Sequence, residues 1–239
     1  MTKKNLLRYV PLSLLILLML VVYFSNLYEH LSFASLKKEQ ASLKLFTEAH
    51  PLISPLLFLL VYTVSVCLII PDSTILTLIG GFAFPLPLAV FLSLLAETLG
   101  ALIFFLIIKE TFNRKKERHY LYKMRQNFHR NAISYLLFLR FSHILPFWFI
   151  NLTAAYCSVP IRTFVWTTLV GVLPLTYLLS DAGRGLSHIF STEATFNLRI
   201  LFTTEMKITL FVFSLLALIP LIYKNWIKRK FGKGLKHFK

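Results

Sequence analysis

The chain has 239 residues, of which 56% are hydrophobic and only 15% are charged, whereas an ordinary soluble domain carries roughly a quarter charged residues. This composition excludes a water-soluble globule, because too few polar side chains exist to cover one. The net charge of +16 does not indicate nucleic-acid binding, since the basic residues gather in two short segments beside apolar ones, at 109–130 and 224–239. The sequence has no metal-ligand spacing, no cofactor fingerprint and no hydrolase motif, so we expect no metal, no cofactor and no enzymatic activity.

Apolar stretches of membrane-spanning length recur along the chain, and the hydrocarbon core of a bilayer needs about 20 helical residues. They lie at 9–28, 55–70, 86–108, 132–157, 161–182 and 207–224. The first stretch is long for a signal peptide and no small-residue cleavage site comes after it, so it favours a retained anchor. The sequence therefore predicts an all-α integral membrane protein.

Two of these regions carry helix-breaking residues, because proline removes a backbone donor and paired glycines loosen the residues after them. The breaks are Pro71-Asp72 and Gly80-Gly81 within 55–84, and Pro146 within 132–157. If each broken region crossed the membrane once, the basic loop at 109–130 would lie outside, against the positive-inside rule. We therefore expect about four transmembrane helices and two opposed re-entrant elements, with full helical hairpins as the alternative.

This topology predicts five regions along the chain and places both termini in the cytoplasm. The regions are a transmembrane anchor at 1–30, an interfacial amphipathic segment at 31–50, a membrane core at 51–185, an outer loop and last helix at 186–224, and a basic tail at 225–239. The compact chain with short tails favours a bacterial inner membrane. The basic segments also favour affinity for anionic lipid headgroups.

A few ionisable residues fall inside the apolar segments, where each costs at least about 2.5 kcal/mol on insertion scales. Glu97 lies midway along 86–108, Arg140 lies about nine residues into its broken segment, and Asp72 comes directly after a proline at the break. We expect Arg140 to bind an anionic headgroup and Asp72 or Glu97 to relay protons. His143, three residues after Arg140, suits a proton-linked step. The alternative is that one carboxylate neutralises Arg140 and the pair only fixes helix packing.

The order of several motifs resembles that of the DedA/VTT (SNARE-associated Golgi protein) superfamily, and it is most similar to the Tvp38-like branch. The matching residues are Pro71-Asp72, Gly80-Gly81-Phe82-Ala83-Phe84, Gly100-Ala101, Arg140 to Pro146, Asn151, and Gly171-Val172-Leu173-Pro174. The resemblance covers roughly residues 50–185. It departs from the family pattern at Phe84-Pro85, at Ala155 and at Lys109.

This resemblance implies a bilayer-embedded protein with opposed re-entrant loops that moves phospholipid or polyprenyl-phosphate headgroups between leaflets, with the proton-motive force implicated in bacterial members. It adds Asn151 to the expected pathway formed by Asp72, Glu97, Arg140 and His143. Two other function classes stay open: a small-solute or ion transporter that uses the same pocket, and a membrane scaffold that transports nothing.

Overall fold

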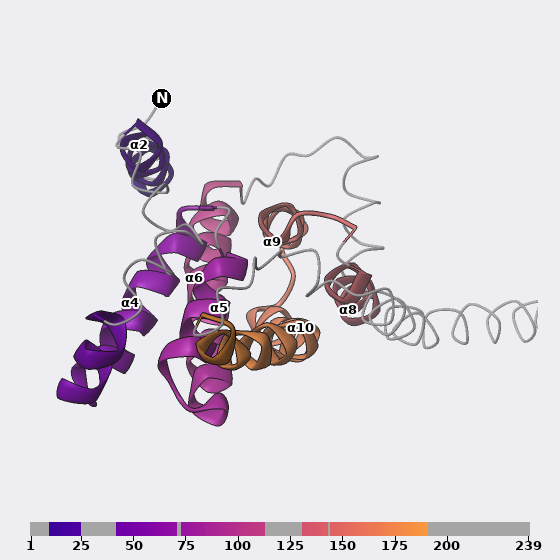
Figure 1. The fold of residues 1–239 in the computed structure, drawn as a ribbon. Helices are drawn as coiled ribbons and strands as arrows, with labels where there is room; N and C mark the ends of the chain where they lie inside the picture. The colour runs from indigo at the N-terminus through magenta and orange to yellow at the C-terminus, as the bar shows by residue number, and fades with distance from the viewer. Residues whose placement is uncertain (1–9, 25–41, 71–72, 113–130, 143, 191–239) are drawn as a thin grey trace, which may run out of the picture.

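A computed structural model describes residues 10–24, 42–70, 73–112, 131–142 and 144–190. These residues form helices and no strand, which confirms the all-α class (Figure 1). Several expectations lie outside the described residues: those on Pro71, Asp72, His143, the basic loop at 113–130, the helix at 207–224 and the basic tail.

Eight helical segments make up the described part of the chain. They are α2 (Val10–Phe24), an unlabelled helix (Ser42–Ala49), α4 (Ile53–Cys67), α5 (Ser73–Ala83), α6 (Leu86–Phe112), α8 (Ala132–Ser142), α9 (Phe147–Tyr156) and α10 (Ile161–Phe190). The helix Ser42–Ala49 falls within the segment expected to be interfacial, and it is bent by 120° from α4. Helix α10 continues beyond its expected end at residue 182.

Helix length separates these segments into two groups. Helix α6 has 27 residues and α10 has 30, so at about 1.5 Å per residue each is longer than a hydrocarbon core of roughly 30 Å. Both are also apolar enough to cross a membrane, and the bent pair Ser42–Ala49 and Ile53–Cys67 would add a third span if it counts as one. Helices α5, α8 and α9 have only 10 or 11 residues, about 15–16 Å, and none of the three reaches across a bilayer alone.

Helix α4 ends in a turn whose hydrogen bonds stop the helix. Ile69 has a φ of 57°, its N–H donates to the Val66 carbonyl at 3.2 Å, and the Ile70 N–H donates to the Ser65 carbonyl at 3.0 Å. These are the two bonds of a Schellman motif, in which the left-handed residue is usually glycine. Pro71 comes next in the sequence and cannot continue the helix.

Helix α9 ends in the same way. Ser158 has a φ of 53°, its N–H donates to the Ala155 carbonyl at 2.9 Å, and the Val159 N–H donates to the Ala154 carbonyl at 3.1 Å. Pro160 then precedes α10. Two helix ends 89 residues apart therefore use one local geometry, with a non-glycine residue in the left-handed position and a proline two residues later in the sequence.

The break expected at Pro146 is present. Pro146 has extended backbone angles (φ −56°, ψ 141°) and immediately precedes α9, so its missing N–H falls where a helix start leaves donors unused. Its carbonyl accepts the Phe149 N–H at 3.0 Å, which begins the new helix. Helix α8, the element that precedes this break, ends at Ser142.

The structure corrects the expectation that Gly80 and Gly81 break their helix. Both lie inside α5, and both are buried. A Cβ atom on Gly81 would overlap the backbone carbonyl of Ser180 on α10, and one on Gly183 would overlap the carbonyl of Leu78 on α5. Without side chains at these positions the two backbones approach closely, as small residues allow between membrane helices. Gly81 and Gly183 thus support packing rather than a turn.

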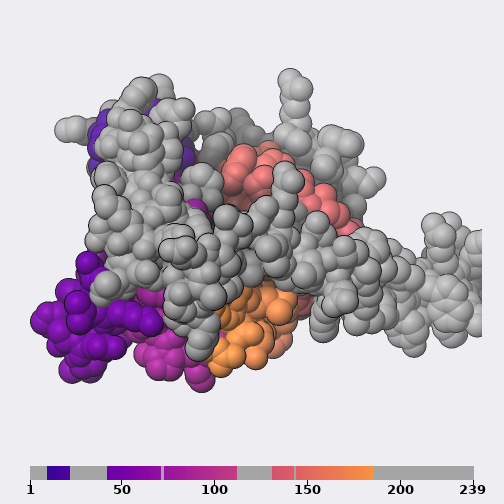
Figure 2. Space-filling model, in the orientation of Figure 1, coloured from indigo at the N-terminus to yellow at the C-terminus, as the bar shows by residue number. Residues whose placement is uncertain are grey.

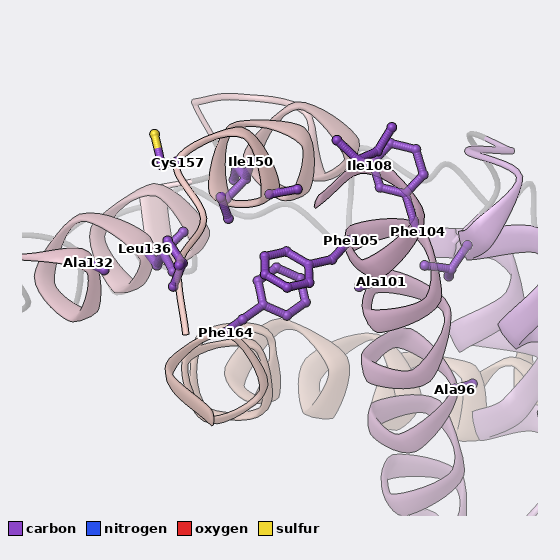
Figure 3. Close-up of a cluster of buried hydrophobic side chains, with 14 of the residues drawn as sticks. Ala96, Ala101, Phe104, Phe105, Ile108, Ala132, Leu136, Ile150, Cys157 and Phe164 are labelled. Carbon is purple, nitrogen blue, oxygen red and sulfur yellow. The ribbon is translucent and has the colours of Figure 1, made fainter. Parts of the chain in front are cut away.

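The centre of the molecule is packed with aromatic and aliphatic side chains from α6, α9 and α10. Figure 3 shows the rings of Phe105 on α6 and Phe164 on α10 stacked between these helices, with Ile150 of α9 nearby. The ring centroids lie 4.2 Å apart with an interplanar angle of 21°. Such contacts fix the position of α10 against α6, and the two helices lie side by side in the space-filling view (Figure 2).

The outward faces of the helices are apolar. Large exposed hydrophobic residues include Leu14, Leu17 and Val21 on α2, Leu56 and Leu60 on α4, Phe91 and Ile103 on α6, and Trp166 and Leu173 on α10. Water-exposed surfaces rarely carry so much contiguous apolar area. Together with the spanning length of α6 and α10, this surface indicates that lipid surrounds the helices.

Candidate functional site

A cavity of about 140 Å³ lies among α4, α5, α6, α8, α9 and α10. Its polar lining comes from Ser73, Thr74, Thr77, Glu97, Arg140 and Thr176, and its apolar lining includes Val66, Leu139, Phe147, Ile150, Val172 and Leu175. Among the described residues, the lining therefore combines one acidic side chain, one basic side chain and several hydroxyls with apolar walls. Short broken helices and long continuous ones both contribute to it.

Glu97 projects from the middle of α6 and is held by hydroxyl groups from two other helices. The Tyr62 hydroxyl of α4 donates to Glu97 Oε1 at 2.6 Å, and the Thr176 hydroxyl of α10 donates to Glu97 Oε2 at 3.1 Å. The Tyr62 oxygen also lies 2.7 Å from Thr77 Oγ1 of α5, and the Thr77 hydroxyl donates to the Ser73 carbonyl at 2.8 Å. One hydrogen-bonded network thus joins α4, α5, α6 and α10 at the carboxylate.

Arg140 is only 2% exposed and is held by neutral groups. Its Nη1 donates to the Phe164 carbonyl at 3.3 Å and to Thr167 Oγ1 at 3.1 Å, both on α10. Its Nη2 donates to Asn151 Oδ1 of α9 at 3.4 Å. Arg140 therefore ties its own short helix, α8, to both α9 and α10.

Two aromatic rings flank the guanidinium group. Arg140 Cζ lies 5.0 Å from the centroid of Phe164 and 5.9 Å from that of Phe147. Both distances are within the range in which a ring face attracts a cation, and the attraction is larger where water is excluded. The stack of Phe164 on Phe105 links this arrangement to α6.

Arg140 and Glu97 line the same cavity without pairing. No Arg140 nitrogen lies within 4.0 Å of a Glu97 oxygen, and none of the described carboxylates forms an ion pair with Arg140. Within the described part of the chain, Arg140 Nε is buried and has no hydrogen-bond partner. Buried charges in proteins are normally paired, so a guanidinium with an unused donor beside a cavity indicates a binding site.

Gly171 gives the arginine room to pass α10. A Cβ atom at this position would lie 2.8 Å from Arg140 Cβ and 2.9 Å from Arg140 Cδ. Pro174, three residues later, lies inside α10 and removes one backbone donor there. The Gly-x-x-Pro motif noted in the sequence therefore lies where α10 passes the arginine stem.

The structure brings together three of the five expected pathway residues. Glu97 and Arg140 face one cavity, and Asn151 binds Arg140, whereas Asp72 and His143 lie outside the described residues. The expectation that a carboxylate neutralises Arg140 directly is not met by Glu97.

Sequence reasoning missed the hydroxyl groups that hold these charges. They belong to Tyr62, Thr77, Thr167 and Thr176. Tyr62 carried a usable signal, because a phenol within an apolar run needs a partner for its polar tip when buried. The threonines carried none, since a threonine in a membrane helix usually bonds to its own backbone.

Two further polar contacts lie away from the cavity. Lys109, which departs from the family pattern, donates from Nζ to the Val159 carbonyl at 2.9 Å and so supports the turn between α9 and α10. Asp181 and Arg184 form an ion pair at 2.6 Å within the outer part of α10, and both side chains are well exposed. An exposed pair of this kind contributes at most about 1 kcal/mol to stability.

The long apolar helices, the lipid-facing exterior and the polar cavity define a helical integral membrane protein. Residues 70–185 match the family model described as the VTT domain. Among curated proteins, the chain is 31% identical over 169 residues to Transmembrane protein 41B of Xenopus tropicalis, covering 68% of this chain and 58% of that one. It is 31% identical over 168 residues to Transmembrane protein 41B of Mus musculus (68% and 56%) and to Transmembrane protein 41 homolog of Drosophila melanogaster (67% and 50%).

The chain carries a VTT domain and belongs to the DedA/VTT superfamily, as the motif order predicted. The described site residues Glu97, Arg140 and Asn151 all lie within the matched region. The chain spans 50–58% of the length of these curated relatives. No solved structure matches it.

Proposed function

We propose that this protein moves phospholipid or polyprenyl-phosphate headgroups across the bilayer through the cavity, with Arg140 binding the phosphate. One observation carries the proposal: Arg140, a buried cation with no carboxylate partner among the described residues, lines a cavity with apolar walls. Guanidinium groups suit phosphate because their planar donors match its oxygens. Apolar lining residues such as Leu139 and Val172 would accompany the acyl chains.

We propose further that α4–α5 and α8–α9 are the two re-entrant elements. Each contains at least one helix of 11 residues or fewer, and each reverses at a proline-containing break. Irregular backbone is tolerated at membrane depth only where protein or a wet cavity surrounds it, and residues of both elements line this cavity. In this topology four helices span, the basic segments at 109–130 and 224–239 face the cytoplasm, and both termini lie there.

We propose that a proton gradient sets the direction in which the headgroup moves across the bilayer. Glu97 faces the cavity and accepts hydrogen bonds from Tyr62 and Thr176, so it can take up a proton while it keeps a hydrogen-bonded position. Asp72 is the second proposed proton carrier. Our proposal includes no enzymatic step.

The test measures transbilayer movement in liposomes that contain the purified protein. Phospholipids labelled on an acyl chain are incorporated, and a membrane-impermeant reductant reports how fast inner-leaflet label reaches the outside, with and without a pH gradient. We expect the wild type to accelerate movement and Arg140→Gln to abolish most of the acceleration. Arg184→Gln is the matched control, because this arginine is exposed on α10.

Folding is checked by monodispersity in detergent and by thermal stability for every variant. If folded Arg140→Gln moves lipid as fast as the wild type, the arginine is not on the pathway. If the wild type accelerates no phospholipid or polyprenyl phosphate, the lipid proposal fails, and uptake of small solutes would then separate a solute transporter from a scaffold. If the pH gradient does not change the rate of lipid movement, only the proton-coupling part of the proposal fails.

A further inference from the structure

The cavity holds a positive and a negative group that do not neutralise each other. Arg140 and Glu97 both line it, yet no nitrogen of one lies within 4.0 Å of an oxygen of the other. In a low-dielectric environment opposite charges attract strongly, so two such side chains are expected to meet unless other contacts hold them apart.

Those other contacts are present on both sides. Tyr62 and Thr176, from α4 and α10, hold Glu97, whereas Asn151 and Thr167, from α9 and α10, hold Arg140. The rings of Phe147 and Phe164 also flank the guanidinium. The separation is therefore built by several neutral partners on three helices and does not depend on a single rotamer.

Both groups keep unused hydrogen-bonding capacity. Arg140 Nε has no partner among the described residues, and a guanidinium can donate five hydrogen bonds. Each Glu97 oxygen accepts one hydroxyl from a described residue, whereas a carboxylate can accept about four hydrogen bonds in all. Arg140 and Glu97 therefore each retain hydrogen-bonding capacity while their present partners stay in place.

We infer that the cavity selects a zwitterionic headgroup, with its phosphate on Arg140 and its primary ammonium on Glu97. This inference rests on the proposed function and names the class of headgroup that the same site takes. The phosphate–ammonium chemistry is shared by the headgroup of an aminophospholipid and by free phosphoethanolamine. The headgroup of an aminophospholipid, with one phosphate charge and one ammonium, compensates both of the described charges, those of Arg140 and Glu97.

The volume of the cavity and the charges that line it both contribute to selectivity among headgroups. A volume of about 140 Å³ corresponds to roughly four or five water molecules at about 30 Å³ each, which suits a compact headgroup. A choline group is bulkier and has no N–H to donate to Glu97. A headgroup that carries only negative charge would satisfy Arg140, and Glu97 would then need a proton to be neutralised, at a cost that an ammonium partner avoids.

The experiment compares acyl-labelled phosphatidylethanolamine, phosphatidylcholine and phosphatidylglycerol in the liposome assay. For the wild type we expect phosphatidylethanolamine to move faster than phosphatidylglycerol by about tenfold, which corresponds to a modest net charge interaction of about 1.4 kcal/mol. In Glu97→Gln, which nearly keeps the size of the side chain and removes its charge, the ratio of phosphatidylethanolamine movement to phosphatidylglycerol movement should fall to about one. Glu110→Gln is the control, because Glu110 is exposed on the same helix.

The wild-type comparison decides the inference even if a variant fails to fold. Equal or faster movement of phosphatidylglycerol overturns it while leaving the proposed lipid transport intact. A ratio that Glu97→Gln leaves unchanged overturns the role of Glu97. No movement of any lipid would instead be a failure of the proposed function itself.

A second arm separates the two sources of the ligand. Radiolabelled phosphoethanolamine is offered outside the same liposomes, and its uptake is measured. Lipid movement without uptake supports an aminophospholipid headgroup. Uptake that Glu97→Gln abolishes, without lipid movement, supports the same zwitterionic chemistry and assigns it to a free solute.

Discussion

The two charged walls of the cavity are built in different ways. On one wall, Glu97 lies on a continuous spanning helix and receives hydroxyl hydrogen bonds from Tyr62 and Thr176. On the other, Arg140 lies on a helix of 11 residues and relies on a backbone carbonyl, an amide, a hydroxyl and two rings. The carboxylate is thus fixed to the rigid part of the molecule, whereas the guanidinium belongs to a broken element.

This difference suggests a division of labour between the walls. A short helix joined to its neighbour by a break can shift with fewer lost contacts than a long helix packed along its length. Arg140 itself ties α8 to α9 and α10, so the position of the guanidinium depends on contacts among three helices. Three substitutions test the comparison, because each disturbs one wall, or the packing beneath it, and spares the other.

The largest effect is expected at Gly81, where α5 crosses α10 beneath the Glu97 wall. A methyl group in Gly81→Ala would overlap the backbone of Ser180, which cannot move as a flexible side chain can, so the helices must separate. We expect a loss of about 3 kcal/mol or more in stability, measured as the shift in thermal unfolding in detergent. In Gly185→Ala, on the same α10, the added methyl would meet nothing within 4 Å, and stability should be unchanged or slightly higher.

An intermediate effect is expected at Gly171, which is next to the Arg140 wall. The methyl group of Gly171→Ala would lie 2.8 Å from Arg140 Cβ, and the arginine stem would have to shift. We expect a loss of about 1–3 kcal/mol in stability and a fall in lipid movement approaching that of Arg140→Gln. Wild-type lipid movement in this variant, again beside Gly185→Ala, would show that the exact position of the guanidinium does not matter.

The smallest effect is expected at Tyr62. Tyr62→Phe removes the hydroxyl that donates to Glu97 Oε1 and leaves the ring in place, so we expect about 1–2 kcal/mol of lost stability. Headgroup preference should weaken because the carboxylate is less firmly positioned, while Arg140-dependent movement continues. Tyr177→Phe, at an exposed position on α10, is the control. An equal loss of stability in both variants would mean that the hydroxyl network does not hold the Glu97 wall.

Much of the architecture was predictable because its causes are local. The spanning length of α6 and α10 results from runs of apolar residues, and the break before α9 results from the missing N–H of Pro146. The energetic cost of a charge in lipid marked Glu97 and Arg140 as functional candidates before any contact was known. The order of the motifs identified the superfamily. Asn151 was expected in the pathway because of that resemblance.

The contacts between helices could not be predicted in the same way. A glycine pair is compatible with a loosened turn and with a close helix crossing, and only the approach of Ser180 to Gly81 decides between them. Likewise, the sequence indicated that Arg140 and a carboxylate share the membrane interior, and it left open whether they pair.

The sequence by itself thus determined that this is a helical membrane protein of the DedA/VTT superfamily with broken helices and a small set of buried charges. Hydropathy, helix breaking and the charge rule act on neighbouring residues, so they can be read along the chain. The tertiary structure alone decided that Glu97 and Arg140 face one cavity from separate walls. That outcome depends on which hydroxyls and carbonyls of α4, α9 and α10 lie next to each charge. The pattern of residues within one helix does not indicate which side chains of another helix it will contact.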